Sequence, residues 1–89
     1  MPEQYILKLY VTGTTPNSLR SIANIKAICE AHLEGRYQLE VHDLYQEPEL
    51  IRRHHLIAAP TLVKEHPLPY RKLIGDLSDT ERVLAGLGL

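Results

Sequence analysis

Hydrophobic and polar residues alternate strictly in two stretches of this chain. In residues 37–44 the hydrophobic positions, Val41 among them, are expected to face inward. In residues 5–11 one face of the strand carries Tyr5, Leu7, Leu9 and Val11. A period of two is typical of strands with one buried face. Two shorter apolar stretches, at residues 58–63 and 70–74, predict two further strands.

A spacing of three and four residues between apolar positions predicts a helix from Pro16 to about Leu33. Pro16 suits the first helical position, and either Thr14 or Thr15 can cap the free amides behind it. The apolar stripe of this helix is expected to consist of Leu19, Ile22, Ile25, Cys29 and Leu33.

Two shorter helices are predicted further along the chain. Residues 48–55 are acidic at their start and basic at their end, which suits the helix dipole. Ser78 and Glu81 form a capping box ahead of a last helix at residues 79–87. Gly86 and Gly88 are each expected to weaken this helix by about 1 kcal/mol relative to alanine.

The predicted elements follow one another in the order βαβαββα. A right-handed crossover through the first helix makes the first two strands parallel, and the short turn at residues 67–69 makes the last two antiparallel. A chain of 89 residues can bury one core, so we expect a single domain over residues 1–89. The predicted fold is α/β, a four-stranded mixed sheet with helices on both faces, which is the thioredoxin-like plan.

Composition and charge exclude several classes of function. The net charge is −1 and both halves of the chain are balanced, so no basic surface for nucleic acid or membranes is expected. The single cysteine excludes an internal disulfide framework. No apolar run approaches the roughly 18 residues of a membrane span and no signal peptide is visible, so we expect a cytoplasmic location.

Thioredoxin-like enzymes hold a Cys-x-x-Cys motif in the turn between the first strand and the first helix, because the helix N-terminus stabilises a thiolate. The corresponding residues 14–17 read Thr-Thr-Pro-Asn here and contain no cysteine. Cys29 lies about three turns further on, within the apolar stripe, where the role of a small core residue is favoured. We therefore predict that the protein is not an oxidoreductase, and no cofactor is expected.

The five histidines do not form a recognisable metal site in the sequence. His54 and His55 are adjacent, so on a helix they point about 100° apart and cannot easily share an ion. None of the others has a partner at a ligand-like spacing. Solvated histidines are the favoured interpretation, and no metal is expected.

Pro60 leaves two alternatives open. A cis bond before a proline has a prior of only about 5–6%. Thioredoxin-like folds nevertheless keep a cis proline at this position, facing the first turn. The other alternative is a trans proline that starts an edge strand.

Several strings of residues resemble the KaiB family of small bacterial clock proteins. They are YILKLYVTGTTPNSLR at residues 5–20, the spacing D-x-x-x-x-P-x-L from Asp43 to Leu50, AAPTLVK at residues 58–64 and RKLIGDLSDTERVLAGL at residues 71–87. The resemblance runs from about Tyr5 to Leu87 without a gap, and the strings TPNS and IGDLSD are specific to that family.

This resemblance implies a non-enzymatic regulator that binds the N-terminal ATPase ring of a KaiC-type hexamer and, in the clock, sequesters KaiA. It also implies a metamorphic chain, in which a self-associated ground state, a dimer or tetramer, exchanges with a thioredoxin-like monomer that binds the ATPase. The βαβαββα order describes the binding-competent form. The alternative is a docking module in a SasA-like histidine kinase pathway or for another signalling partner.

By the same resemblance, partner binding is expected at Arg20, Gln38, Glu40 and His55. Clock proteins usually carry lysine where Glu40 and His55 stand, and a charge reversal at an interface costs affinity or changes the partner. The chain also ends at Leu89 without the acidic tail of the clock proteins. These departures favour a divergent homologue that serves stress or signalling timing over a core clock protein.

The resemblance places the fold switch in the C-terminal half of the chain. Its expected positions are Pro60, Pro67, Pro69, Gly75, Asp76, Gly86 and Gly88. Proline isomerisation takes tens of seconds or more, which suits a slow switch.

Overall fold

The structure is a computed structural model that describes residues 4–53 and 60–89. Four sequence-based expectations fall on the remaining residues and so lie outside the described ones. They are the end of the helix predicted at residues 48–55, the role of His55, the start of the strand predicted at residues 58–63, and the isomer of the bond that joins Ala59 to Pro60.

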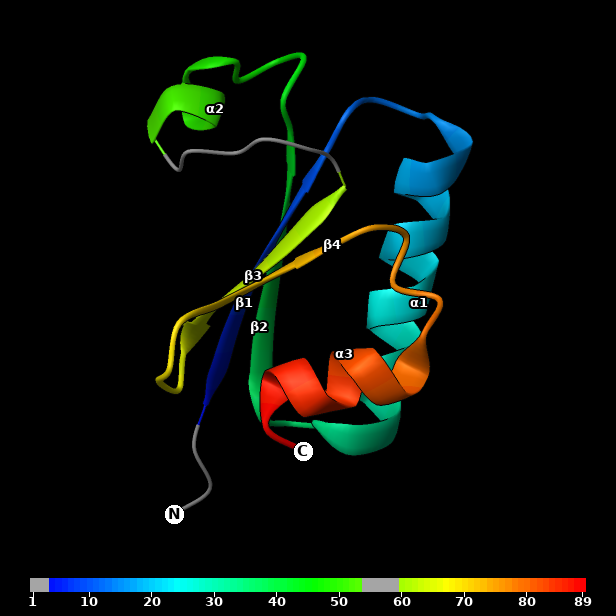
Figure 1. The fold of residues 1–89 in the computed structure, drawn as a ribbon, viewed down its shortest axis with the longest axis vertical. Coiled ribbons are helices and arrows are strands. Elements are labelled where there is room, and N and C mark those ends of the chain that lie inside the picture. Colours follow the sequence, from blue (N-terminus) through cyan, green and yellow to red (C-terminus); the bar gives the residue numbers. More distant parts are fainter. Residues whose placement is uncertain (1–3, 54–59) are drawn as a thin grey trace.

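Within residues 4–53 and 60–89, seven elements occur in the predicted order (Figure 1). They are β1 (Tyr5–Val11), α1 (Pro16–His32), β2 (Tyr37–Asp43), α2 (Glu49–Arg53), β3 (Thr61–His66), β4 (Arg71–Ile74) and α3 (Thr80–Leu87). The strands form one sheet in the order β2-β1-β3-β4. β1 pairs with β2 in parallel, whereas β1 with β3 and β3 with β4 are antiparallel. The predicted thioredoxin-like fold and its mixed sheet are therefore confirmed.

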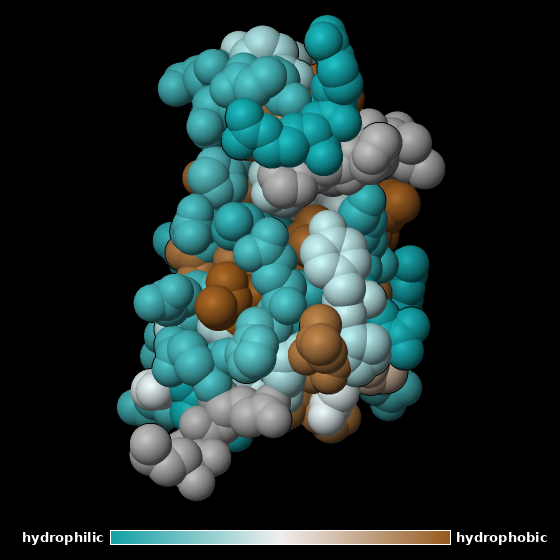
Figure 2. Space-filling view, turned by 90° about the vertical axis from the view of Figure 1, so that its left-hand side faces the viewer, coloured by the Kyte–Doolittle hydropathy of each residue, from teal (hydrophilic) through white to brown (hydrophobic). Residues whose placement is uncertain are grey.

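The two faces of the sheet are covered unequally. α1 and α3 pack on one face and enclose the main core, which includes Leu7, Leu9 and Ile25. On the other face the short α2 contributes Leu50 to a small cluster with Tyr10, Leu44 and Val63. Figure 2 shows this second face, where hydrophobic side chains are scattered among hydrophilic ones and form no continuous apolar patch among the residues that are coloured.

Two predictions of buried positions are wrong. Val41 is 43% exposed because β2 is an edge strand, so its inward-facing side chains lie at the border of the core. Leu19 is 51% exposed, whereas Ser18 and Ser21 of the same helix are fully buried. The two serines satisfy their hydroxyl groups locally, since Ser21 Oγ donates to the Ser18 carbonyl and Ser18 Oγ accepts from the Thr12 amide. Small side chains with local partners let α1 lie close to the sheet.

β3 runs from Thr61 to His66 and so ends three residues later than its apolar residues predict. The strand is central, because β1 and β4 flank it on either side, and its backbone pairing continues into polar residues. Glu65 is held by an ion pair with Lys8 of β1 at 3.2 Å. Lys64 is only 4% exposed and lies opposite Leu7. Since β3 is a central strand, Pro60 does not start an edge strand.

Capping decides where the helices begin and end. Thr15 caps α1, where its hydroxyl accepts from the Ser18 amide, and Pro16 is the first helical residue as predicted. Asp79 rather than Ser78 caps α3, because its carboxylate accepts from the Arg82 amide at 3.2 Å. Ser78 lies one residue too early and instead donates its own amide to Asp76.

Candidate functional site

The turn between β1 and α1 is built to hold a fixed shape. The Gly13 amide donates to the Asp43 carboxylate at 3.1 Å, and the Tyr45 ring lies against Gly13 so closely that an added Cβ would meet it at 3.1 Å. Thr15 donates its hydroxyl to Ser18 Oγ at 2.8 Å. Where redox enzymes of this fold place a cysteine pair, this chain therefore has a capped and braced turn of threonines.

Cys29, the single cysteine, lies in the main core and is fully buried. Burial raises the pKa of its thiol to about 11. A thiol with this pKa is almost entirely protonated at neutral pH, and the thiolate is the reactive form. The prediction that Cys29 is a core residue agrees with its position.

Arg20 and Asp76, two of the predicted site residues, meet although they are far apart in the sequence. Arg20 Nε lies 3.3 Å from Asp76 Oδ2, and the Arg20 guanidinium also donates to Asn17. Hydrogen bonds from Ser78, followed by the charge of Arg20, hold the pKa of Asp76 below its usual value. Asn24 adds a second link, since its amide donates to the Asp76 carbonyl at 2.9 Å. The loop between β4 and α3 is thus tied to the exposed side of α1.

Gln38 and Glu40 lie on β2, at the opposite edge of the sheet. Both side chains are exposed. β2 and β4 are separated by three inter-strand spacings, about 14 Å in all. Arg20 contacts the loop that follows β4, so the predicted partner-binding residues do not form one compact cluster but mark two regions of the molecule.

His42 was not predicted as a site residue, yet it organises the surface of β2. Its Nε2 lies 3.0 Å from Glu40 and its Nδ1 lies 3.1 Å from Glu47. Its ring stacks on Tyr10, with centroids 5.5 Å apart. Burial, followed by the charges of nearby carboxylates, raises the pKa of Tyr10 to about 12. Tyr10 and His42 are partners in the parallel pairing of β1 with β2. Aligning the two predicted strands in this register would have predicted the cluster.

The residues expected to serve a fold switch occupy turns and helix ends. Pro67 and Pro69 lie in the turn between β3 and β4 and follow cis peptide bonds. Gly75 ends β4 with a φ of +119°, and its amide donates to the Pro60 carbonyl.

Gly86 and Gly88 hold different places at the end of the chain, Gly86 inside α3 and Gly88 directly after it. Gly88 lies after the helix and caps it with a left-handed φ of +80°, and its amide donates to the Ala85 and Leu84 carbonyls. This conformation is the one in which glycine is favoured. At Gly86 an added Cβ would lie 2.8 Å from the Leu73 side chain. The missing Cβ therefore lets α3 approach β4.

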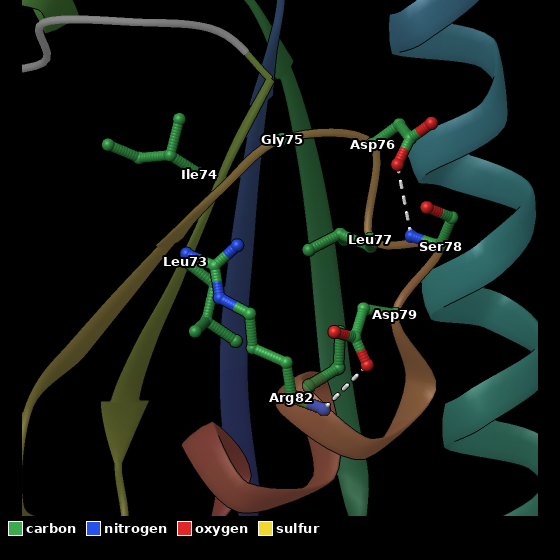
Figure 3. Close-up of a pocket in the computed structure, with 9 residues that line it drawn as sticks. Leu73, Ile74, Gly75, Asp76, Leu77, Ser78, Asp79 and Arg82 are labelled. Atoms are coloured by element: carbon green, nitrogen blue, oxygen red, sulfur yellow. Dashed lines mark hydrogen bonds between the residues drawn. The ribbon is translucent and has the colours of Figure 1, made fainter.

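A pocket of about 80 Å³ lies between the end of β4, the loop and the start of α3 (Figure 3). Its walls include Leu73, Leu77 and Val83, and Arg82 extends across it toward β4. Among residues 4–53 and 60–89, no group of histidine, cysteine, aspartate and glutamate side chains is placed to hold a metal ion. Within the same part of the chain, no helix is both long enough and apolar enough to cross a membrane.

Fold and turn together define a thioredoxin-like protein without the cysteine pair of the redox enzymes. The KaiB domain model matches residues 8–89. The circadian clock oscillator protein KaiB of Synechococcus elongatus is 52% identical over 85 residues, which cover 96% of this chain and 83% of that protein. The chain belongs to the KaiB family.

Solved structures match the fold of this chain. The N-terminal domain of Synechococcus elongatus SasA matches with a TM-score of 0.78 and 27% identity, covering 99% of this chain and 87% of that one. Mitochondrial thioredoxin 3 from Saccharomyces cerevisiae matches with a TM-score of 0.76 and 14% identity, covering 98% and 80%. The second likeness concerns the fold alone.

Proposed function

We propose that this chain is a non-enzymatic regulator that docks on a KaiC-type hexameric ATPase in circadian, stress or signalling timing. The observation that carries the proposal is the 52% identity to a KaiB clock protein over 96% of the chain. The turn between β1 and α1 contains no cysteine, and Cys29 is buried with a raised pKa. Both observations support a role in binding rather than in thiol chemistry. No cofactor is needed for such a role.

The docking surface that we propose begins on α1. Arg20 presents an exposed guanidinium, and its neighbour Leu19 is a half-exposed apolar side chain on the same helix. Arginine is enriched among the residues that contribute most to the free energy of binding at protein interfaces. Gln38 and Glu40 on the edge strand β2 would form a second contact region.

The resemblance also supports a slow exchange between this thioredoxin-like form and a self-associated ground state. The segment that would be remodelled contains Pro67, Pro69, Gly75 and Asp76, and in this form Asp76 is engaged by Arg20. In the proposed sequence of events, the oligomer dissociates, the monomer adopts the fold described above, and the monomer then binds the ATPase.

The test measures binding to a purified KaiC-type hexamer in the presence of ATP, with the mass of the complex followed by light scattering. The expected result is a larger complex that forms after a lag from an initial dimer or tetramer. Arg20→Ala is expected to weaken binding on the order of tenfold, the loss of about one charge-assisted hydrogen bond. Lys26→Ala removes an exposed positive charge from the same helix and is the matched control.

Thermal melting of each variant separates a binding effect from a folding defect. A stable oligomer that never engages the hexamer would contradict the proposed function. Equal binding by the Arg20→Ala and Lys26→Ala variants would contradict the docking surface alone.

A second candidate function is favoured by the SasA likeness. A domain that is 27% identical to the N-terminal domain of SasA could serve a histidine kinase pathway as a docking module. Binding to a SasA-like kinase in the absence of any KaiC-type hexamer would favour this function. Competition between the chain and such a kinase for one hexamer would favour the first.

A further inference from the structure

Lys64 of β3 is an almost completely buried lysine. It is 4% exposed, and its Cα partner on β1 is Leu7, which belongs to the main core. Among the described residues, its ammonium group makes no ion pair and no hydrogen bond. Lysine is rarely buried unless it is paired, because burial removes the charge from water. An unpaired lysine at this position therefore points to a ligand of opposite charge.

The ammonium group of Lys64 keeps contact with solvent although the rest of the residue is buried. Within the described part of the chain, no fully buried side-chain nitrogen or oxygen lacks a hydrogen-bond partner, so an unpaired ammonium must reach the surface. A Cβ added at Gly88 would lie 4.0 Å from Lys64 Nζ, which places the ammonium beside the C-terminal end of α3. The stem of Lys64 is thus buried, and its charge is accessible to a ligand that approaches from solvent.

A second positive charge lies directly across from Lys64. Lys64 and Arg71 are Cα partners in the antiparallel pairing of β3 with β4, so their side chains share one face of the sheet. Side chains placed opposite each other in this way have Cβ atoms about 4.5–5.5 Å apart, and like charges there are destabilising. Arg71 is exposed and has no ion-pair partner among residues 4–53 and 60–89. The two cations repel each other, and an anion that contacts both would remove this repulsion.

The C-terminal end of α3 supplies only part of the negative charge that Lys64 lacks. The carbonyl end of a helix carries a partial negative charge, which attracts cations. The Leu84 and Ala85 carbonyls, however, already accept hydrogen bonds from the amides of Gly88 and Leu89. The helix end therefore favours a positive charge on Lys64 but does not account for Arg71.

We propose that Lys64 and Arg71 bind a phosphate group, either free phosphate or the phosphate ester of a small molecule. A phosphate group carries close to two negative charges at neutral pH, whereas a carboxylate carries one. Two cations in opposite positions of a strand pair match the doubly charged group better. The Arg71 guanidinium binds two phosphate oxygens with its planar fork, and the Lys64 ammonium contacts a further oxygen as a point charge.

This phosphate site is distinct from the docking surface proposed above. Arg71 is the first residue of β4, whereas Arg20 contacts the loop that follows the last residue of that strand. Gln38 and Glu40 lie on β2, at the opposite edge of the sheet. The inference does not depend on a KaiC-type partner, and the test uses no ATPase, so either proposal can fail alone.

The test titrates the full chain with inorganic phosphate, with glycerol 3-phosphate and with acetate at constant ionic strength, and follows backbone amide NMR shifts. Two charge-assisted hydrogen bonds correspond to a dissociation constant on the order of 1 mM. We expect saturable shifts centred on Lys64, Arg71 and Gly88 with at least one phosphate compound, and at least tenfold weaker binding of acetate. Tighter binding of glycerol 3-phosphate would identify a phosphate ester as the ligand, and tighter binding of inorganic phosphate would identify the free anion.

Two variants test the cations separately. Lys64→Met removes the charge while it keeps most of the volume of the buried side chain, and it is expected to weaken phosphate binding at least tenfold. Arg71→Gln should weaken binding to a similar extent, and because Arg71 is exposed this variant keeps the test decisive if Lys64→Met does not fold. Lys72→Gln is the matched control, since it removes a positive charge from the next residue of β4, whose side chain lies on the other face of the sheet.

Thermal melting gives an independent measurement. A ligand that binds only the folded chain stabilises it, so phosphate at about 20 mM should raise the melting temperature of the parent chain and of Lys72→Gln more than that of Lys64→Met. The proposal is overturned if neither phosphate compound binds at this concentration, or if acetate binds as tightly as phosphate does. It is also overturned if the NMR shifts map away from residues 64 and 71, or if Arg71→Gln binds phosphate as tightly as Lys72→Gln.

Discussion

At the scale of single residues, Gly88 shows how one position can help to fix the end of the chain. It adopts a left-handed conformation that costs other residues roughly 1–2 kcal/mol. Gly88→Ala is therefore expected to lower the free energy of unfolding by about 1 kcal/mol and the melting temperature by about 4–8 °C. Gly88→Asn should lose less, because asparagine tolerates this conformation better. Equal melting of the parent and both variants, measured by circular dichroism, would contradict the cap.

Cys29 gives a second test at this scale. Burial raises the pKa of its thiol from an ordinary 9.0 to about 11, so the folded state favours the neutral thiol. The stabilising contribution is complete below about pH 9 and is lost as the pH rises through about 11. We expect a disulfide reagent to label Cys29 slowly in the native chain and completely in denaturant. Rapid stoichiometric labelling of the native protein at pH 7 would show that the thiol is accessible.

At the scale of elements, the start of α1 depends on one of two adjacent threonines. Thr15 caps the helix and Thr14 does not, although the sequence allowed either. Thr15→Ala is expected to cost about 1 kcal/mol of stability, and Thr14→Ala, the matched control, close to nothing. Denaturant unfolding curves of the two variants decide the point, and equal losses would place the cap elsewhere.

Local sequence predicted the type of every element but not the position of each along the chain. α1 and α3 carry their own caps, so their boundaries fell within one or two residues of expectation. The end of β3 fell outside the predicted range, because the extent of this strand is fixed by β1 and β4 on either side and by the Lys8–Glu65 ion pair. Lys8 and Glu65 are more than fifty residues apart in the sequence. The apolar content of a short stretch cannot reveal partners at such a separation. The exposure of Val41 has the same cause, since burial depends on the place of β2 in the sheet order.

At the scale of the whole molecule, topology was predictable and the arrangement of site residues was not. The crossover through α1 and the turn at Pro67 and Pro69 were sufficient to give the parallel and antiparallel pairs. The contact between Arg20 and Asp76 was not predictable, because it joins two elements through a loop whose path no local pattern specifies. Family resemblance had proposed one of these residues for docking and the other for switching, and the fold makes them neighbours.

That contact has a thermodynamic consequence. Arg20 has a single guanidinium, and in the isolated chain Asp76 shares it. A partner carboxylate that takes Arg20 competes with Asp76, and the loop that forms one wall of the pocket then loses one of its links to α1. Coupling between two binding sites is reciprocal. A ligand that holds this loop in place would therefore change the affinity of a partner for Arg20 by the same factor by which that partner changes the affinity of the ligand for the loop. The Arg20–Asp76 ion pair thus links the exposed side of α1 to the loop between β4 and α3.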